Sequence, residues 1–205
     1  MKEGIFAHWP NRITAIRFVG SIVLFVLLSR WAAGPVEEIQ GVVYATFWLF
    51  LLVAATDFLD GYLARRDNQV TAFGRIADPF VDKVMVIGVM VFLAVLDWSQ
   101  EWFPAWFVVT VLAREFLVTA IRGYVESLGL SFGADWLGKV KMVVQCIAIS
   151  IVLFMFSFPF PAGVMRFLGQ AGHVFVWLTL IATVGSGLSY VFKTKRLLAG
   201  LRDEH

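Results

Sequence analysis

The stretch TDFLDGYLARRDNQVTAFGRIADPFVDKV, residues 56–84, lies between two long apolar runs. Four of its aspartates, Asp57, Asp60, Asp78 and Asp82, stand at the edges of those runs. A charged side chain at the centre of a membrane helix costs about 2.5–3.5 kcal/mol on insertion scales, so acidic residues in such surroundings usually have a function. The fold and the chemistry of this chain both depend on what these carboxylates hold.

The composition of the chain is that of a membrane protein. Of its 205 residues, 60% are hydrophobic and 16% are aromatic, well above the apolar content of a soluble domain. This length accommodates about six helices of roughly 20 residues each. We therefore predict an all-α integral membrane protein with a single domain over residues 1–205. The formal net charge of +2 is too small to indicate nucleic acid as a partner.

Six apolar segments are long enough to cross a hydrocarbon core of roughly 30 Å as helices. They are Ile13–Trp31, Val42–Ala64, Pro79–Leu96, Phe103–Ile121, Val140–Pro159 and Val174–Phe192. We expect these six transmembrane helices to form one bundle. The segment Ser131–Lys139, which contains two glycines and an aspartate, is expected to be a loop.

Basic residues gather at alternate ends of these segments. One set of ends carries Lys2, Arg12, Arg65, Arg66, Arg75, Arg122, Lys139, Lys141, Lys193, Lys195, Arg196 and Arg202. Because cytoplasmic loops of membrane proteins are enriched in Lys and Arg, both termini and the aspartate-rich stretch are predicted to be cytoplasmic. The N-terminus lacks a short apolar region with a small-residue cleavage site, so we expect no removable signal peptide.

Helical spacing gathers the aspartates on two faces. Residues at i, i+3, i+4, i+7 and i+8 share one face of a helix, and here they are Asp57, Asp60, Gly61, Ala64 and Arg65. Residues at i, i+4 and i+8 share a face of the next helix, and they are Gly74, Asp78 and Asp82. Clustered carboxylates repel one another unless a cation holds them. Since no cysteine pair or histidine stands at ligand spacing nearby, the pattern favours Mg²⁺ or Mn²⁺ over Zn²⁺.

These eight residues match, without a gap, the signature D-x-x-D-G-x-x-A-R, eight residues, G-x-x-x-D-x-x-x-D. The sequence therefore resembles the CDP-alcohol phosphatidyltransferase family. Four further blocks are similar to bacterial members that use glycerol 3-phosphate: WPNRITAIRF (9–18), DPFVDKVMV (78–86), AREFLVTAIR (113–122) and LGKVKMVVQ (137–145).

The resemblance implies a reaction of phospholipid biosynthesis. A phosphatidyl group would pass from CDP-diacylglycerol to sn-glycerol 3-phosphate, giving phosphatidylglycerophosphate and CMP. It further implies a bacterial inner-membrane enzyme, multi-pass, with its active site on the cytoplasmic side. Membrane lipids would surround the protein, and a homodimer is left open.

The resemblance also implies roles for the motif residues. Asp57, Asp60 and Asp78 would coordinate one divalent ion, and Asp78 with Asp82 and the other carboxylates would complete a site for a second. Asp82, at the end of the acidic face, is our candidate for the general base. The CDP-lipid would lie against Asp60, Gly61, Ala64 and Gly74, with Arg65 as a counter-charge.

Charged and polar residues outside the motif are candidates for acceptor binding. They are Thr14, Arg17, Arg114, Glu115, Arg122, Lys139 and Lys141. Arg supplies the planar, multidonor recognition that an anionic phosphate requires. An alternative for Arg114 and Glu115 is that they only join neighbouring helices. Lys139 and Lys141 are more typical of ordinary positive-inside residues, although basic residues here line the acceptor pocket in the resembling family.

Two other functions remain to be weighed. A member of the same family could use another acceptor, such as serine, inositol phosphate or phosphatidylglycerol. A cation channel or carrier could also line a pathway with aspartates, but it would need polar residues to continue across the membrane. The apolar runs VVYATFWLFLLVAA and VMVIGVMVFLAVL beside the aspartates argue against such a pathway.

Overall fold

The computed structural model describes residues 9–67, 72–130 and 136–203, with the backbone alone described for 9–10, 57–67, 72–76 and 200–203. The described residues form six α-helices and no β-strand. The helices are α1 (Trp9–Trp31), α2 (Val36–Asp67), α3 (Ala72–Val95), α4 (Ala105–Ser127), α5 (Trp136–Ser157) and α6 (Ala162–Asp203). The prediction of an all-α protein with six helices is confirmed.

The helices extend beyond several of the predicted spans. The largest difference is in α6, which has 42 residues where the sequence predicted Val174–Phe192. At 1.5 Å per residue this helix is about 63 Å long, roughly twice the thickness of a hydrocarbon core. The loop predicted over Ser131–Lys139 is wrong in its last four residues, because α5 begins at Trp136.

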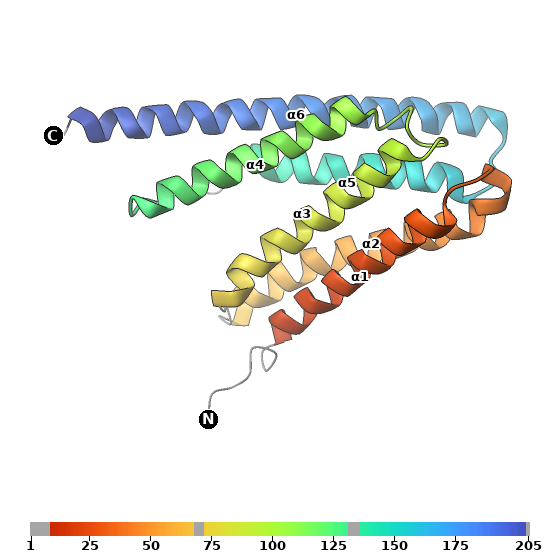
Figure 1. The fold of residues 1–205 in the computed structure, drawn as a ribbon, viewed down its shortest axis with the longest axis horizontal. Helices are drawn as coiled ribbons and strands as arrows, with labels where there is room; N and C mark the ends of the chain where they lie inside the picture. Colours follow the sequence, from red (N-terminus) through yellow and green to blue (C-terminus); the bar gives the residue numbers. More distant parts are fainter. Residues whose placement is uncertain (1–8, 68–71, 131–135, 204–205) are drawn as a thin grey trace.

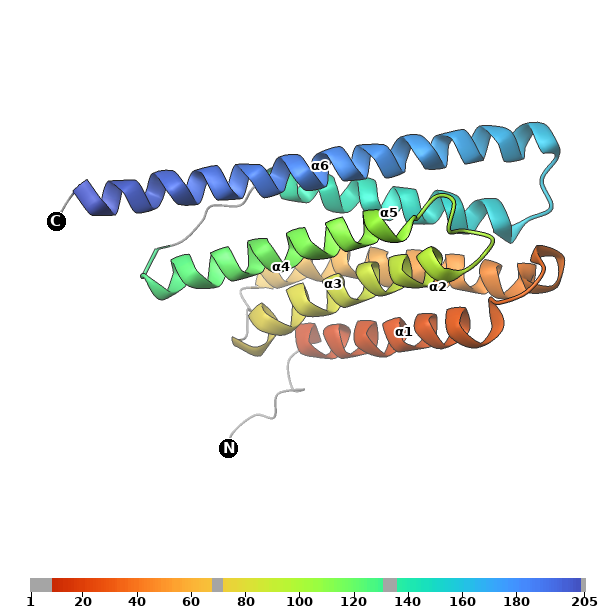
Figure 2. The ribbon, with the colours of Figure 1, turned by 45° about the horizontal axis from the view of Figure 1, so that its top comes forward.

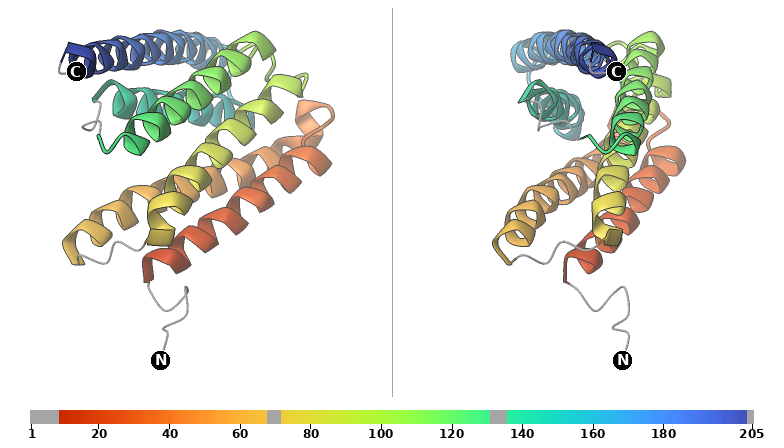
Figure 3. Two further views of the ribbon diagram at one scale, coloured as in Figure 1. Left: turned by 60° about the vertical axis from the view of Figure 1, so that its left-hand side comes forward. Right: turned by 90° about the vertical axis from the view of Figure 1, so that its left-hand side faces the viewer.

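The six helices run alternately up and down and pack in a closed ring (Figures 1 and 2). Each packs against two neighbours in the order α1, α2, α5, α6, α4, α3 and back to α1, and α3 also touches α5 across the ring. An end-on view shows this order (Figure 3). The starts of α1, α3 and α5 and the ends of α2, α4 and α6 lie at one end of the bundle (Figure 1). We call this the polar end.

Two glycines allow α1 to lie close to both of its neighbours. A Cβ atom on Gly20 of α1 would lie 2.8 Å from the Val53 side chain of α2. A Cβ atom on Gly88 of α3 would overlap the Phe25 ring of α1. Small residues allow close helix approach in membrane proteins. This packing brings the first turns of α1 against the acidic end of α3.

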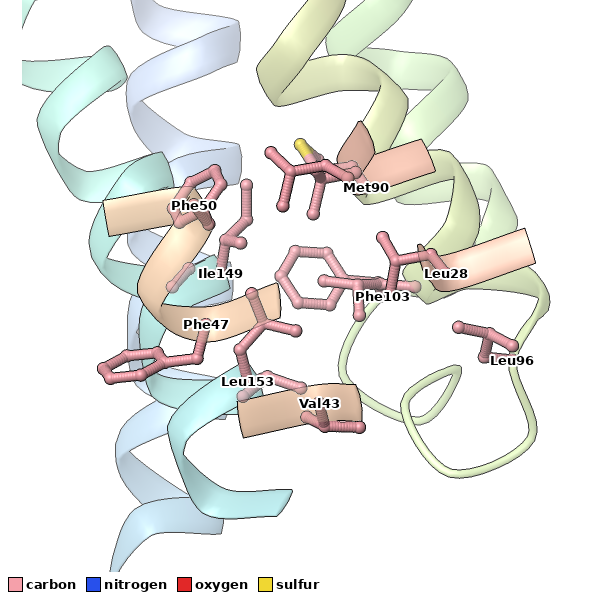
Figure 4. Packing of buried hydrophobic residues seen from close by; sticks show 14 of the residues in the cluster. Leu28, Val43, Phe47, Phe50, Met90, Leu96, Phe103, Ile149 and Leu153 are labelled. Carbon is pink, nitrogen blue, oxygen red and sulfur yellow. The ribbon is translucent and has the colours of Figure 1, made fainter. Parts of the chain in front are cut away.

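An apolar core fills the bundle away from the polar end (Figure 4). Its members come from all parts of the ring and include Leu28, Val43, Phe47, Phe50, Met90, Leu96, Phe103, Ile149 and Leu153. Large apolar side chains also cover the outside, where Trp48, Leu52 and Phe116 are more than half exposed. Such a surface suits contact with lipid rather than water.

Four helices of the described chain contain apolar segments able to cross a membrane by length and hydropathy. They are Asn11–Trp31, Val36–Thr56, Trp136–Ser157 and Ala162–Ala199. The chain is therefore a multi-pass membrane protein. Helices α3 and α4 carry charged residues within their apolar runs. The count of six membrane spans and the cytoplasmic side of the termini remain predictions.

Candidate functional site

A cavity of about 600 Å³ lies among α3, α4, α5 and α6. Its charged and polar lining comprises Asp78, Asp82, Lys83, Arg114, Glu115, Arg122, Lys139, Lys141, Gln145 and Tyr190. Most of these residues come from the parts of the helices near the polar end. Asp78 and Asp82 contact α1, whereas most of the basic groups gather around Glu115, so the two clusters are described in turn.

The acidic wall consists of Asp78 and Asp82, one turn apart on α3, with Thr14 and Arg17 of α1 behind them. Thr14 Oγ1 donates a hydrogen bond to Asp78 Oδ1. Arg17 Nη1 lies 2.5 Å from Asp82 Oδ1, and its Nη2 lies 3.6 Å from Asp78 Oδ1. The Arg17 side chain is only 2% exposed. A buried guanidinium thus neutralises carboxylates that would otherwise repel each other.

The cationic wall surrounds one buried carboxylate, that of Glu115 on α4. Lys141 Nζ of α5 forms an ion pair with Glu115 Oε1. Arg114 Nη1 lies 2.9 Å from the same oxygen, and Lys83 Nζ of α3 lies 3.8 Å from Oε2. Lys83 also donates to Thr119 Oγ1 at 2.7 Å. We define the cationic wall as Lys83, Arg114, Glu115, Arg122, Lys139 and Lys141.

Lys139 and Lys141, for which the sequence predicted the same role, differ in burial. Lys139 is exposed, whereas Lys141 is only 6% exposed and lies against Glu115. The interpretation of Lys141 as an ordinary positive-inside residue is therefore wrong, because its ammonium group is in the protein interior. Glu115 does join neighbouring helices, as the alternative for it predicted, but it does so in the wall of the cavity.

Tyr190 of α6 holds the outer part of the cationic wall. Its hydroxyl accepts a hydrogen bond from Arg122 Nη2, and its side chain is almost fully buried. The Arg122 Cζ atom lies 5.2 Å from the centre of the Tyr190 ring, and the Arg114 Cζ atom lies 5.9 Å from it. These are cation–π distances, so one aromatic ring orients two arginines.

Three lining residues were missed by sequence reasoning: Lys83, Gln145 and Tyr190. Gln145 stands four residues after Lys141, so helical spacing could have indicated it. Lys83 follows Asp82 directly, and adjacent residues of a helix do not share a face, so spacing from Asp82 does not indicate it. No spacing rule links Tyr190 to α4. Its position follows from the packing of α6 against α4.

Six motif residues lie outside the described side chains. They are Asp57, Asp60, Gly61, Ala64, Arg65 and Gly74. Their backbones belong to α2 and α3, as the predicted helical faces require. Among the side chains that the structure describes, no group of three His, Cys, Asp or Glu residues gathers as a metal site.

The arrangement can bind two kinds of charge at once. Carboxylate oxygens on the acidic wall suit a hard cation or a transferable proton. The guanidinium and ammonium groups of the cationic wall suit a phosphate. Because both walls line one cavity, a group bound on one side can react with a group bound on the other.

The sequence of this chain is similar to those of known proteins. Residues 7–185 match the family model described as CDP-alcohol phosphatidyltransferase. The chain is 33% identical over 195 residues to the CDP-diacylglycerol–glycerol-3-phosphate 3-phosphatidyltransferase of Bacillus subtilis, covering 90% of this chain and 93% of that protein. The Rickettsia typhi protein of the same name is 35% identical over 181 residues, with coverages of 88% and 93%. For the Escherichia coli K12 protein of this name, the identity is 33% over 149 residues, with coverages of 70% and 75%.

Proposed function

Because the chain belongs to the CDP-alcohol phosphatidyltransferase family, it is a phosphatidyltransferase, and we propose that its substrates are CDP-diacylglycerol and sn-glycerol 3-phosphate. A hydroxyl oxygen of the acceptor forms a bond to the β-phosphorus of the lipid diphosphate. The bond from that phosphorus to the bridging oxygen breaks, so CMP leaves and phosphatidylglycerophosphate remains. The names of the three relatives support this donor and acceptor.

The cationic wall is the observation that carries the acceptor assignment. Five basic residues and a single glutamate line that side of the cavity. The phosphate of glycerol 3-phosphate is a dianion, and its charge must be met by protein cations. In this proposal Arg114, Lys141 and Arg122 bind the phosphate, and the exposed Lys139 attracts it.

In this proposal Asp82 is the general base. It lies in the same cavity as the cationic wall, so the acceptor hydroxyl can approach it while the phosphate is bound. Thr14 and Arg17 are positioning residues in this proposal, because they touch the carboxylates rather than the cavity. Their contacts hold Asp78 and Asp82 in place before substrate binds.

The acidic wall also fits a divalent cation on the chemistry of its donors. Asp78 and Asp82 present carboxylate oxygens at the cavity, and their side chains remain 40% and 19% exposed. We propose that they hold two Mg²⁺ or Mn²⁺ ions together with Asp57 and Asp60. When bound, the ions neutralise the diphosphate and make its β-phosphorus more electrophilic. The CDP group would lie along the α2 face that carries Gly61, Ala64 and Arg65, near Gly74 of α3.

A panel of acceptors tests the substrate assignment. The purified protein would be given CDP-diacylglycerol with glycerol 3-phosphate, serine, inositol phosphate or phosphatidylglycerol, and CMP release would be measured. We expect release with glycerol 3-phosphate, and loss of that release with a chelator followed by recovery with Mg²⁺ or Mn²⁺. A preference for any other acceptor would leave the family unchanged and overturn the substrate.

The orientation in the membrane is proposed from charge. The basic residues of the polar end support a cytoplasmic active site in a bacterial inner membrane. A reporter fused to either terminus is expected to score as cytoplasmic. An external score for one terminus would mean that the number of spans is odd.

A further inference from the structure

Gln145 is a buried amide in the wall of the cavity whose hydrogen-bonding capacity is hardly used. It lies one helical turn beyond Lys141 on α5, and only 2% of its surface is exposed. Its Nε2 donates to the thioether sulfur of Met90 on α3. Within the described part of the chain, this is the one hydrogen bond that the Gln145 side chain makes.

Such a contact leaves most of the amide without a proper partner. A thioether is a weak acceptor, whereas a glutamine amide offers two donors and a carbonyl oxygen that accepts two hydrogen bonds. Buried polar groups in native proteins are nearly always hydrogen-bonded to protein or water, so the unused positions of this amide are available to water or to a ligand in the cavity. The neighbouring lining residues Val86, Val118 and Met142 are apolar and supply no substitute.

Several buried hydroxyl groups of this bundle are satisfied within their own helices. Ser21, Thr46 and Ser157 each donate to the carbonyl oxygen four residues earlier, at 2.6 to 2.8 Å. These hydroxyls therefore need nothing from the cavity. Gln145 differs from them, because its amide projects toward Met90 and lines the cavity.

We propose that Gln145 recognises the secondary hydroxyl of the acceptor and is a specificity-determining residue. This inference rests on the proposed function. Glycerol 3-phosphate would present its phosphate to Arg114 and Lys141 and its attacking primary hydroxyl to Asp82. The middle carbon then carries a hydroxyl between these two points. An amide matches this group, because a hydroxyl both donates and accepts a hydrogen bond.

The test uses two acceptors that differ only in this hydroxyl. 3-Hydroxypropyl phosphate retains the phosphate and a primary hydroxyl but lacks the secondary one. For the wild-type protein, kcat/KM with glycerol 3-phosphate should exceed that with the analogue by about tenfold or more, because a site that hydrogen-bonds a hydroxyl rejects the analogue lacking it. In Gln145→Met this ratio should fall to near one.

The ratio of the two acceptors is measured in one preparation, so partial unfolding of a variant does not affect it. Met90→Leu is the matched control, because it removes the thioether, keeps the amide and should keep the wild-type ratio. Gln145→Asn, which shortens the side chain, should lower the ratio and replaces Gln145→Met if that variant does not fold.

Equal use of both acceptors by the wild type would overturn this inference, and so would an unchanged ratio in the Gln145 variants. Absence of CMP release from the wild type with glycerol 3-phosphate would instead overturn the proposed function.

Discussion

The acidic wall and the cationic wall face the same cavity. The two carboxylates of the acidic wall are close together in the sequence, whereas the residues of the cationic wall come from segments far apart in it. Asp78 and Asp82 are one turn apart on a single helix. Glu115 of α4 takes its partners Lys83 and Lys141 from α3 and α5. The two carboxylates of the acidic wall are therefore placed together by one helix, although their counter-ion Arg17 comes from α1. The cationic wall exists only when three helices are packed.

The walls also differ in how their charges are balanced within the protein. On the acidic wall, the buried Arg17 contacts two carboxylates, and the side chain of Asp78 remains 40% exposed. On the cationic wall, Glu115 contacts three basic groups and is itself almost fully buried. Each wall thus keeps one internal counter-ion and has charge left for a ligand of the opposite sign.

The largest effect is expected from removing charge on the acidic wall. Asp82→Asn should lower kcat by about 10²–10⁴-fold, because an amide cannot accept the proton of the attacking hydroxyl. Acceptor-dependent CMP release measures this loss. Asp97→Asn, at an exposed position near the opposite end of α3, is the matched control and should retain full activity. Wild-type turnover in Asp82→Asn would show that Asp82 is not the general base.

The second prediction concerns stability rather than turnover. Glu115→Ala leaves Lys141 and Arg114 buried without a counter-charge, so the free energy of unfolding should fall by about 3–5 kcal/mol. Denaturant unfolding in detergent measures it. Glu101→Ala removes a largely exposed carboxylate near His173 and should change stability little.

Restoring charge balance sharpens this test. The double variant Glu115→Gln with Lys141→Met should recover most of the lost stability but not the use of glycerol 3-phosphate. If Glu115→Ala unfolds at the same denaturant concentration as the wild type, the cationic wall does not depend on an internal counter-ion.

The third prediction separates acceptor from donor. Arg122→Ala removes one charge-assisted contact, worth about 1.5–3 kcal/mol, so the apparent KM for glycerol 3-phosphate should rise roughly ten- to hundredfold. The KM for CDP-diacylglycerol should stay nearly constant. Arg65→Ala should show the reverse pattern if Arg65 serves the donor. An unchanged acceptor KM in Arg122→Ala would exclude Arg122 from the acceptor site.

The smallest effect is expected from the support of that arginine. Tyr190→Phe removes the hydroxyl that accepts from Arg122 but keeps the aromatic ring under it. One hydrogen bond of about 0.5–1.5 kcal/mol corresponds to a two- to tenfold rise in acceptor KM. Tyr124→Phe alters an exposed tyrosine of α4 and serves as the control. Equal KM values for the two variants would show that the ring alone positions Arg122.

Much of the fold could be predicted because its signals are local. Long apolar runs predict helices wherever they stand, and all six were found. Helix ends were predicted less well, as the 42-residue α6 shows, because the polar residues after Phe192 end the apolar run without ending the helix. Hydropathy indicates which residues lie in the membrane, whereas the length of a helix is set by how far its backbone hydrogen bonds continue.

The sequence by itself determined that this is a helical membrane protein, that its aspartates share helical faces and that it resembles a phosphatidyltransferase. These conclusions follow from composition and from spacings of three, four and eight residues, which one helix translates directly into space. The burial of Lys141, the partners of Glu115 and the position of Tyr190 were decided only by the tertiary structure. They depend on the ring order of the helices, which brings α3, α4, α5 and α6 around one cavity. No spacing along the chain encodes that order, because it results from side chains packing between segments far apart in sequence.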